Sequence, residues 1–167
     1  MLRRILPLLA GLLCCAITAG AAQAGAPHDD WPKIDGRLWI NHNDRDATHH
    51  GTARNDELLG GHGNDRIFGH GGADVIWGDS KASGNTASQR DALMGGRGAD
   101  WIYASHGRNR IWGGAGNDTI RVWFGRGFVD CGPGRDILYV SHKSGPHVKR
   151  RGCEKISHKS ARQAAGG

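Results

Sequence analysis

Seven aspartates occupy the same position in a unit that repeats along the chain. Each is followed two residues later by an aliphatic side chain, and most lie 9 or 18 residues from the next. They are Asp56, Asp65, Asp74, Asp91, Asp100, Asp118 and Asp136. A carboxylate is a hard oxygen ligand, and the carbonyl groups of nearby turns supply further oxygens. The pattern therefore predicts a site for hard divalent cations that uses neither sulfur nor imidazole.

Aspartate also favours turns for a local reason, because its side chain hydrogen-bonds to neighbouring backbone groups. That explanation covers a single copy of the unit, but it does not account for a fixed register. Carboxylates stacked at the strand spacing of about 4.8 Å repel one another, and a divalent cation between each pair removes the repulsion. We therefore expect metal binding rather than turn formation alone.

The elements that position these aspartates belong to nine tandem units of nine residues, which cover residues 51–139, with one insertion from Ser80 to Gln89. Glycine is abundant, with 28 of 167 residues. A nine-residue period with one obligatory aliphatic residue, at the eighth position, excludes an amphipathic helix. It fits a short strand whose middle side chain points inward, followed by a six-residue turn. The aliphatic residues are Leu58, Ile67, Ile76, Leu93, Ile102, Ile111, Ile120, Val129 and Leu138.

The units resemble the G-G-x-G-x-D-x-U-x nonapeptides of RTX, or haemolysin-type, calcium-binding proteins. The clearest copies are GGHGNDRIF from Gly60, GGRGADWIY from Gly95 and GGAGNDTIR from Gly113. The resemblance implies an all-β fold, a parallel β-roll whose successive strands alternate between two sheets, with two units per coil. It also implies several Ca²⁺ ions between stacked turns, held by the seven aspartates and by backbone carbonyls. The glycines of these turns are Gly60, Gly63, Gly95, Gly98, Gly113, Gly116 and Gly134.

Alternation between two sheets would divide the aspartates between two edges of the roll. The odd-numbered units place Asp56, Asp74, Asp100, Asp118 and Asp136 on one edge, here called the odd edge. The even-numbered units place Asp65, Asp91, Asn109 and Gly127 on the other, the even edge. We expect up to four ions on the odd edge and one or two on the even edge, where the insertion also lies. Folding should then depend on calcium, because the carboxylates cannot stack without it.

The N-terminus has the features of a secretory signal peptide, residues 1–24. A basic start and an apolar run precede the small-residue site Ala22-Gln23-Ala24. A membrane anchor is the alternative, but the run is short for a bilayer. We expect the signal peptide to be cleaved and the mature chain to have no membrane span. The protein should then be secreted and extracellular, through bacterial-type export by its N-terminal signal peptide. Only Cys131 and Cys153 then remain, and in an oxidising compartment they should form a disulfide.

The sequence divides into four segments. After the signal peptide, residues 25–50 should cap the first coil and residues 51–139 should form the roll. Residues 140–167 should form a disulfide-tied cap that ends in a basic tail. We expect a monomer.

Two surface features could bind a partner. A basic cluster near the C-terminus could contact an anionic cell-envelope polymer or glycan, or it could be solvated and offset the aspartates. No nucleic-acid-binding motif accompanies it, so we expect no nucleic-acid partner. Outward strand positions carry side chains that could form a sugar or partner surface, or could be covered by the N-terminal segment or the insertion. The cluster is His147, Lys149, Arg150, Arg151, Lys155, His158, Lys159 and Arg162, and the outward residues are Phe68, Val75, Trp77, Trp101, Tyr103, Trp112 and Tyr139.

Enzyme signatures are missing from the sequence. It contains neither the H-E-x-x-H motif of zinc proteases nor the G-x-S-x-G motif of lipases, and its histidines lack the spacing of a tetrahedral metal site. The leading hypothesis is a secreted calcium-binding protein, not an enzyme, that folds on binding Ca²⁺ and has a structural or adhesive role. The alternative is a small secreted hydrolase or polysaccharide-active protein that uses the aromatic face.

Overall fold

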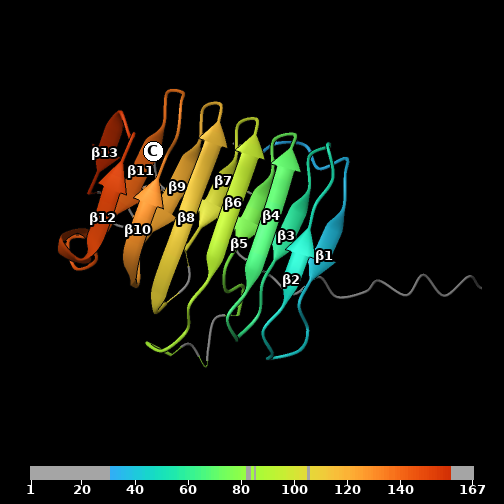
Figure 1. Cartoon of the computed structure of the whole chain (residues 1–167), viewed down its shortest axis with the longest axis horizontal. Coiled ribbons are helices and arrows are strands. Elements are labelled where there is room, and N and C mark those ends of the chain that lie inside the picture. Colours follow the sequence, from blue (N-terminus) through green and yellow to red (C-terminus); the bar gives the residue numbers. More distant parts are fainter. Residues whose placement is uncertain (1–30, 82–83, 85, 105, 159–167) are drawn as a thin grey trace, which may run out of the picture.

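The computed structural model describes residues 31–158, apart from residues 82–83, 85 and 105. Over these residues the chain winds into a solenoid built from short parallel strands (Figure 1). The predicted signal peptide and the last basic residues, Lys159 and Arg162, lie outside the described residues. No helix among the described residues is long and apolar enough to cross a membrane.

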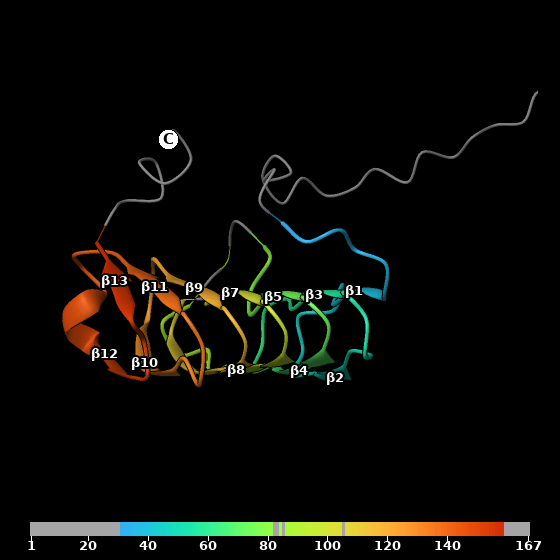
Figure 2. The same ribbon diagram turned by 90° about the horizontal axis from the view of Figure 1, so that it is seen from above.

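The strands form two sheets that face each other as two layers (Figure 2). The seven-stranded sheet contains β1 (Leu38–Ile40), β3 (Glu57–Leu59), β5 (Val75–Trp77), β7 (Trp101–Tyr103), β9 (Thr119–Val122), β11 (Ile137–Val140) and β13 (Lys155–Ser157), in that spatial order. The six-stranded sheet contains β2 (Thr48–His50), β4 (Arg66–Gly71), β6 (Ala92–Arg97), β8 (Arg108–Ala115), β10 (Arg126–Asp130) and β12 (Val148–Arg151). A short 3-10 helix, η1 (Gly145–His147), precedes β12.

The all-β, parallel roll predicted from the repeats is confirmed. Odd-numbered units supply the strands β3, β5, β7, β9 and β11 of one sheet, and even-numbered units supply β4, β6, β8 and β10 of the other. Because each unit is half a coil, nine units do not make nine turns. The roll has about six turns in all, since β1 and β2 precede the units and β12 and β13 follow them.

The core is a column of aliphatic side chains between the two sheets. All nine residues at the eighth position of the units are at most 1% exposed. They lie in register from coil to coil, for example Ile76 beside Ile102 and Leu93 beside Ile111. An inward side chain at the middle of each strand therefore explains why one aliphatic residue per unit is sufficient.

Both ends of the core are closed by larger groups. At the N-terminal end Trp39 of β1 and His49 of β2 stack with ring centroids 4.0 Å apart, and Trp39 packs against the core. At the C-terminal end the predicted disulfide between Cys131 and Cys153 is confirmed, with 5.2 Å between the Cα atoms. Buried apolar surface at the open ends of a solenoid has to be covered in this way.

Candidate metal centre

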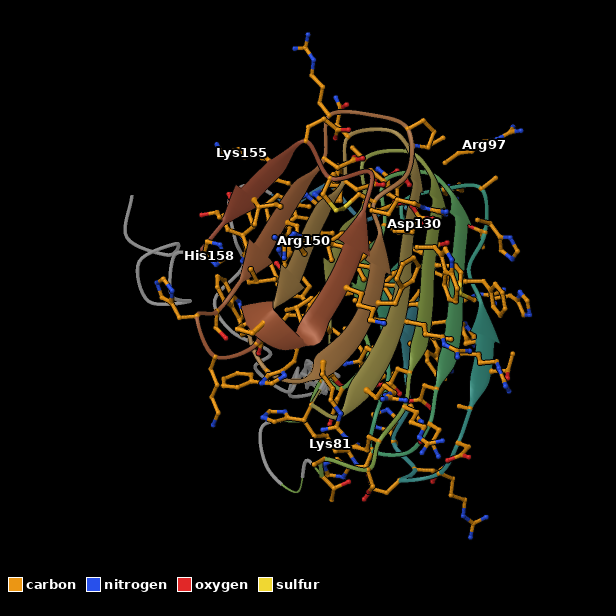
Figure 3. All side chains as sticks on the ribbon, turned by 60° about the vertical axis from the view of Figure 1, so that its left-hand side comes forward. Lys81, Arg97, Asp130, Arg150, Lys155 and His158 are labelled. Carbon is orange, nitrogen blue, oxygen red and sulfur yellow. A yellow bond between two sulfur atoms is a disulfide. The ribbon has the colours of Figure 1, made fainter. Side chains whose placement is uncertain are left out.

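The odd edge of the roll holds a straight column of buried aspartates. Each one is the last turn residue before a strand of the seven-stranded sheet: Asp56 before β3, Asp74 before β5, Asp100 before β7, Asp118 before β9 and Asp136 before β11. All five are at most 1% exposed. In Figure 3 the label Arg97, at the end of β6, marks this edge of the roll, and the label Lys81, in the insertion, marks the opposite edge.

A ladder of hydrogen bonds connects the column from coil to coil. The backbone N–H of Asp74 donates to Oδ1 of Asp100 at 2.9 Å, and that of Asp100 donates to Oδ1 of Asp118 at 2.9 Å. The N–H of Asp56 and that of Asp118 make the same bond to the next aspartate, each at 2.8 Å. One oxygen of each carboxylate in the column is thereby occupied in holding the preceding coil.

The second carboxylate oxygen is different. Oδ2 of Asp74, Asp100, Asp118 and Asp136 is buried and accepts no hydrogen bond from any described residue. A buried carboxylate oxygen without a partner is costly, and a bound cation is the usual compensation. The four unpaired oxygens, one in each of four successive coils, therefore form a column of acceptors that could each bind a cation.

Glycine leaves room beside three of these oxygens. A Cβ atom placed on Gly95 would lie 2.3 Å from Oδ2 of Asp100 and 2.3 Å from the carbonyl oxygen of Gly113 in the next coil. On Gly69 it would lie 2.3 Å from Oδ2 of Asp74 and 2.4 Å from the carbonyl oxygen of Gly95. The first-position glycine thus keeps a carboxylate and a carbonyl oxygen of neighbouring coils accessible to a common ligand.

Gly113 has the same role beside Asp118. A Cβ there would lie 2.5 Å from Oδ2 of Asp118 and 2.3 Å from the carbonyl oxygen of Cys131. The last unit differs, because its first position is Cys131 and not glycine, and the cysteine is buried in the core and bonded to Cys153. Three positions, at Asp74, Asp100 and Asp118, therefore combine an orphaned oxygen with an open glycine.

Burial dominates the electrostatics of the column. The pKa of Asp100 is raised to about 8, mainly by loss of solvation and to a smaller extent by the neighbouring carboxylates of Asp118 and Asp74, while the hydrogen bond from the backbone of Asp74 lowers it. Loss of solvation likewise raises the pKa of Asp74 to about 7 and the pKa of Asp118 to about 6. A divalent cation among these groups would favour their ionised forms instead.

Asp56, at the N-terminal end of the column, has no unpaired carboxylate oxygen among its described contacts. Its Oδ1 accepts a hydrogen bond from the backbone N–H of Arg37, and the Thr52 hydroxyl lies 3.0 Å from both of its oxygens. The backbone N–H of Thr52 also donates to its Oδ2. Asp56 is therefore satisfied by protein groups and closes the column.

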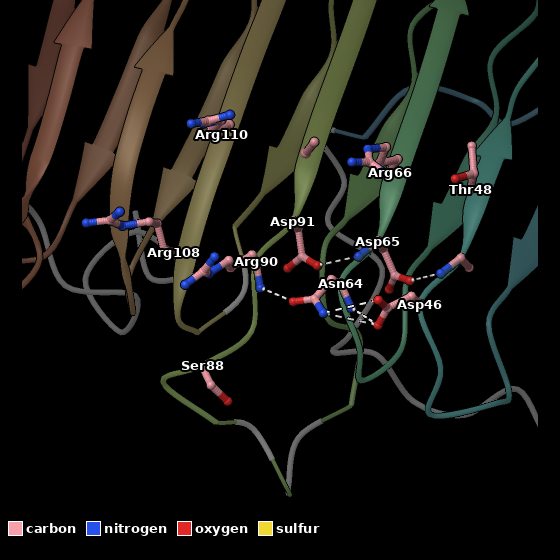
Figure 4. A pocket seen from close by; sticks show the side chains of 12 residues that line it. Asp46, Thr48, Asn64, Asp65, Arg66, Ser88, Arg90, Asp91, Arg108 and Arg110 are labelled. Atoms are coloured by element: carbon pink, nitrogen blue, oxygen red, sulfur yellow. Dashed lines mark hydrogen bonds between the residues drawn. The ribbon is translucent and has the colours of Figure 1, made fainter.

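Asp65, on the even edge, is satisfied in the same way as Asp56. Oδ1 of Asp65 accepts a hydrogen bond from the N–H of Ala47 at 2.9 Å, and Oδ2 accepts one from the N–H of Gly61 at 3.2 Å. The N–H of Asp65 donates to Oδ1 of Asp91 at 2.9 Å (Figure 4). Asn109 follows at the next position of this edge. The difference between the two edges is thus visible in hydrogen bonding as well as in residue type.

The fourth-position glycines serve the stacking of the turns. A Cβ on Gly98, Gly116 or Gly134 would lie less than 2 Å from the carbonyl oxygen of the glycine one coil earlier. Gly63, Gly98 and Gly116 also have positive φ values of 124°, 130° and 137°. Only glycine allows this backbone conformation together with so close an approach of neighbouring turns.

The structure adds one carboxylate to the ladder that the repeat pattern did not include. The backbone N–H of Asp136 donates to Oε2 of Glu154 at 2.7 Å. Glu154 lies 18 residues after Asp136 and directly before β13. Extending the 18-residue period past the last unit would have identified it from the sequence.

Side chains alone do not make a metal site on this protein. Within the part of the chain that the structure describes, no group of three or more His, Cys, Asp and Glu residues is close enough to hold an ion. The donors at the odd edge are single carboxylates accompanied by backbone carbonyls, a purely oxygen set. Such a set fits a hard cation with six to eight oxygen ligands, which describes Ca²⁺ better than a transition metal.

The outward aromatic residues are partly covered. Trp77 and Tyr103, on the outer face of the seven-stranded sheet, stack with centroids 4.1 Å apart. Trp31 of the N-terminal segment donates a hydrogen bond to the Tyr103 hydroxyl at 2.8 Å, and Tyr103 is buried. Val75, another residue of the outward set, is also buried. Of the two alternatives for this face, coverage by the N-terminal segment is the one that the structure shows around Tyr103.

The fold is thus a parallel β-roll, and along its odd edge successive coils each carry a buried carboxylate that can bind a cation. The family model of the RTX calcium-binding nonapeptide repeat, in four copies, matches residues 50–80 and 87–120. These two segments are therefore RTX-type nonapeptide repeats, of the kind that binds calcium in a β-roll. No curated protein and no solved structure matches the chain.

Proposed function

We propose that this protein is exported from the cell and that its roll folds on binding Ca²⁺ along the odd edge. We also propose that the folded protein has a structural or adhesive role. The observation that carries the proposal is the set of orphaned Oδ2 atoms in the column. Without an ion, burial of these oxygens opposes folding, because each carboxylate is either charged and unpaired or must take up a proton. With an ion, the same burial favours folding.

The structure supports three ions in this column. Asp74, Asp100 and Asp118 each place an orphaned oxygen beside an open glycine and a carbonyl oxygen of the next coil. Asp136 lacks the glycine, whereas Asp56 and Asp65 are satisfied by hydrogen bonds. We therefore assign the principal sites to Asp74, Asp100 and Asp118 and none of comparable strength to the even edge.

Export is supported by the predicted signal peptide and by the disulfide, since disulfides persist mainly in oxidising compartments. Extracellular calcium would then be the trigger for folding, with dissociation constants of roughly 10⁻⁴ to 10⁻³ M. RTX repeats are typically structural calcium-binding elements. An adhesive or structural role agrees with this, because the roll makes up most of the described residues.

The test is a calcium titration of the mature chain, followed by circular dichroism and by metal analysis. We expect only part of the chains to be folded in chelator, a cooperative gain of β-structure with calcium, and three ions per chain at saturation. Magnesium is the control: it demands near-ideal octahedral geometry and gives up its waters reluctantly, so it should not replace calcium. A spectrum that is insensitive to calcium, or a protein that magnesium folds equally well, would refute the proposal.

A further inference from the structure

The outer face of the six-stranded sheet carries a group of cations that the calcium sites do not use. We call this surface the basic face; it consists of Arg66, Arg90, Arg108, Arg110, Arg126 and Lys149. All six residues are exposed. None of them forms an ion pair with another residue in the described part of the chain, although Asp130 pairs with Arg151 nearby.

The register of the sheet aligns these cations in rows across the strands. Arg66 of β4, Ala92 of β6 and Arg110 of β8 are successive partners, and the row continues to Lys149 of β12. Arg108 is the direct partner of Arg126 in β10. Like charges on directly adjacent strands, about 4.8 Å apart, destabilise a sheet. A bound polyanion would remove this repulsion.

The basic face is hollowed. One cavity of about 560 Å³ is lined by Arg66, Arg90, Arg108 and Arg110 together with Asp46, Asp65 and Asp91, and a second of about 330 Å³ includes Arg108, Arg110, Arg126 and Lys149. The two cavities share Arg108 and Arg110 and therefore adjoin each other at β8. Figure 4 shows Arg66, Arg90, Arg108 and Arg110 over this part of the sheet. The groove suits an extended chain that lies across the strands.

An apolar row lies beside the cationic row. Phe68, Met94 and Trp112 are successive partners in β4, β6 and β8, and Trp112 is 37% exposed. A third cavity, of about 520 Å³, combines these three residues with Arg66 and Arg110. A ligand with anionic groups along one side and apolar ring faces along the other would match both rows.

Only one aromatic ring of this row, that of Trp112, is exposed, so the row does not form an extended stacking platform for successive bases. The ring of Phe68 is stacked on His50, with centroids 4.5 Å apart and an angle of 6° between the planes, so that this face of the ring is covered. Proteins that bind single-stranded nucleic acid rely on open aromatic faces for their stacking energy. Recognition on the basic face therefore depends on arginine and on apolar contact.

We propose that the basic face binds an acidic polysaccharide. The chain lies across the strands, its carboxylate groups meet the arginine side chains, and the apolar faces of its sugar rings rest on Met94 and Trp112. Arginine is suited to this task because its planar guanidinium group binds a carboxylate through two parallel hydrogen bonds. The inference rests on the adhesive role proposed above and supplies its partner.

The experiment is calorimetric titration of the calcium-loaded protein with hyaluronate, a linear polysaccharide with one carboxylate per disaccharide. Neutral dextran is the control polymer. We expect hyaluronate to bind, with an affinity that falls as salt is raised because exposed charge pairs are screened. The double variant Arg66→Gln with Arg110→Gln should bind on the order of tenfold more weakly or worse, since it loses two charge-assisted contacts.

The matched control is Arg97→Gln with Arg135→Gln, which removes the same charge from two exposed residues outside the basic face, one at the end of β6 and one in a turn. It should retain the affinity of the parent protein. Circular dichroism in the same calcium buffer checks that each variant is folded. If the first variant does not fold, Arg126→Gln with Lys149→Gln tests the same face on two other strands.

Several results would overturn the inference. They are absence of hyaluronate binding by folded protein, equal losses in the two double variants, and tighter binding of oligothymidylate or of anionic lipid vesicles than of hyaluronate. The failure of this inference is distinguishable from failure of the proposed function. A protein that folds with calcium but ignores hyaluronate refutes only the polysaccharide site, whereas a protein whose fold is indifferent to calcium refutes the proposed function.

Discussion

Replacement of Asp100 by asparagine separates the two roles of an odd-edge carboxylate. The amide oxygen can still accept the N–H of Asp74, which lies 2.9 Å from Oδ1 in the parent protein. The orphaned Oδ2 becomes a neutral NH₂ group on the side of Gly95 where the carbonyl oxygen of Gly113 also lies, and that oxygen is the expected acceptor for it. Burial of a neutral amide with a partner costs less than burial of an unpaired carboxylate. The calcium-free variant should therefore be at least as stable as the calcium-free parent.

The calcium-loaded variant should behave in the opposite way. At a calcium concentration about 100 times the dissociation constant, each bound ion adds about 2.7 kcal/mol to the free energy of unfolding. Three ions add about 8 kcal/mol, and loss of the ion at Asp100 leaves about 5 kcal/mol. The stabilisation by calcium should thus fall by about a third, and metal analysis should find one ion fewer.

Asp65→Asn is the matched control on the even edge. Asp65 uses both oxygens to accept backbone N–H groups, from Ala47 and Gly61. An amide can accept only one of them, so the variant leaves a buried N–H facing a second donor, at a cost of about 1–3 kcal/mol. This loss should be the same with and without calcium. The two variants therefore differ in the sign of their effect in chelator and in their response to calcium.

The assay is urea unfolding followed by circular dichroism, in chelator and in saturating calcium, for the parent and both variants. The difference between the two conditions gives the stabilisation by calcium for each protein. The assignment of the metal to the odd edge is wrong if Asp65→Asn reduces this difference and Asp100→Asn does not. It is also wrong if both variants bind as many ions as the parent protein.

Three further predictions concern the glycines, the disulfide and pH. Gly95→Ala should abolish one calcium site and destabilise the roll by about 1–3 kcal/mol, because its Cβ would lie 2.3 Å from Oδ2 of Asp100. Gly71→Ala is the control, since its Cβ would have no neighbour closer than 3.9 Å, and equal calcium binding by both variants would contradict the reasoning. Cys153→Ser should lower the free energy of unfolding by roughly 3 kcal/mol through the loss of a loop constraint, which urea unfolding measures; an unchanged midpoint would show that the disulfide adds nothing. The pKa of Asp100 is raised in the folded chain, so its contribution to calcium-free stability is complete below the ordinary aspartate pKa and is lost as pH rises through about 8. The urea midpoint in calcium-free buffer should accordingly fall between about pH 5 and pH 9, and a midpoint that rises over this range would refute the prediction.

The sequence was sufficient to predict the arrangement of the strands, because the period of nine is also the geometric unit of the roll. One inward side chain per strand fixes the eighth position, and alternation between the sheets places Asp74 and Asp100 on one edge and Asp65 on the other. Within the column, however, the repeat does not distinguish Asp56 from Asp100. That difference depends on Thr52 and on the backbone of Arg37, contacts that no period encodes.

The basic face was not found from the sequence for a related reason. Arg108 and Arg126 are 18 residues apart, but Arg66 and Arg110 are 44 residues apart, because the insertion interrupts the period between them. Only the strand pairing places them in one row. The sequence pointed instead to the C-terminal cluster, of which Lys149 alone belongs to this face. A local run of charge is easy to recognise, whereas charge that is distributed across strands requires the register.

The disulfide at the end of the roll determines how the molecule would respond to a pulling force. Cys131 and Cys153 join the last two coils covalently, so residues 131–153 cannot be extended, while β13 and the first coil are held by noncovalent contacts only. Beyond the short strand β13, tension between the two ends would therefore release coils in sequence from the N-terminal side. Each coil of 18 residues would add about 60 Å of extended chain. A roll anchored at both ends would lengthen in steps and shed an ion with each calcium-bearing coil, and it would wind up again once the load is removed.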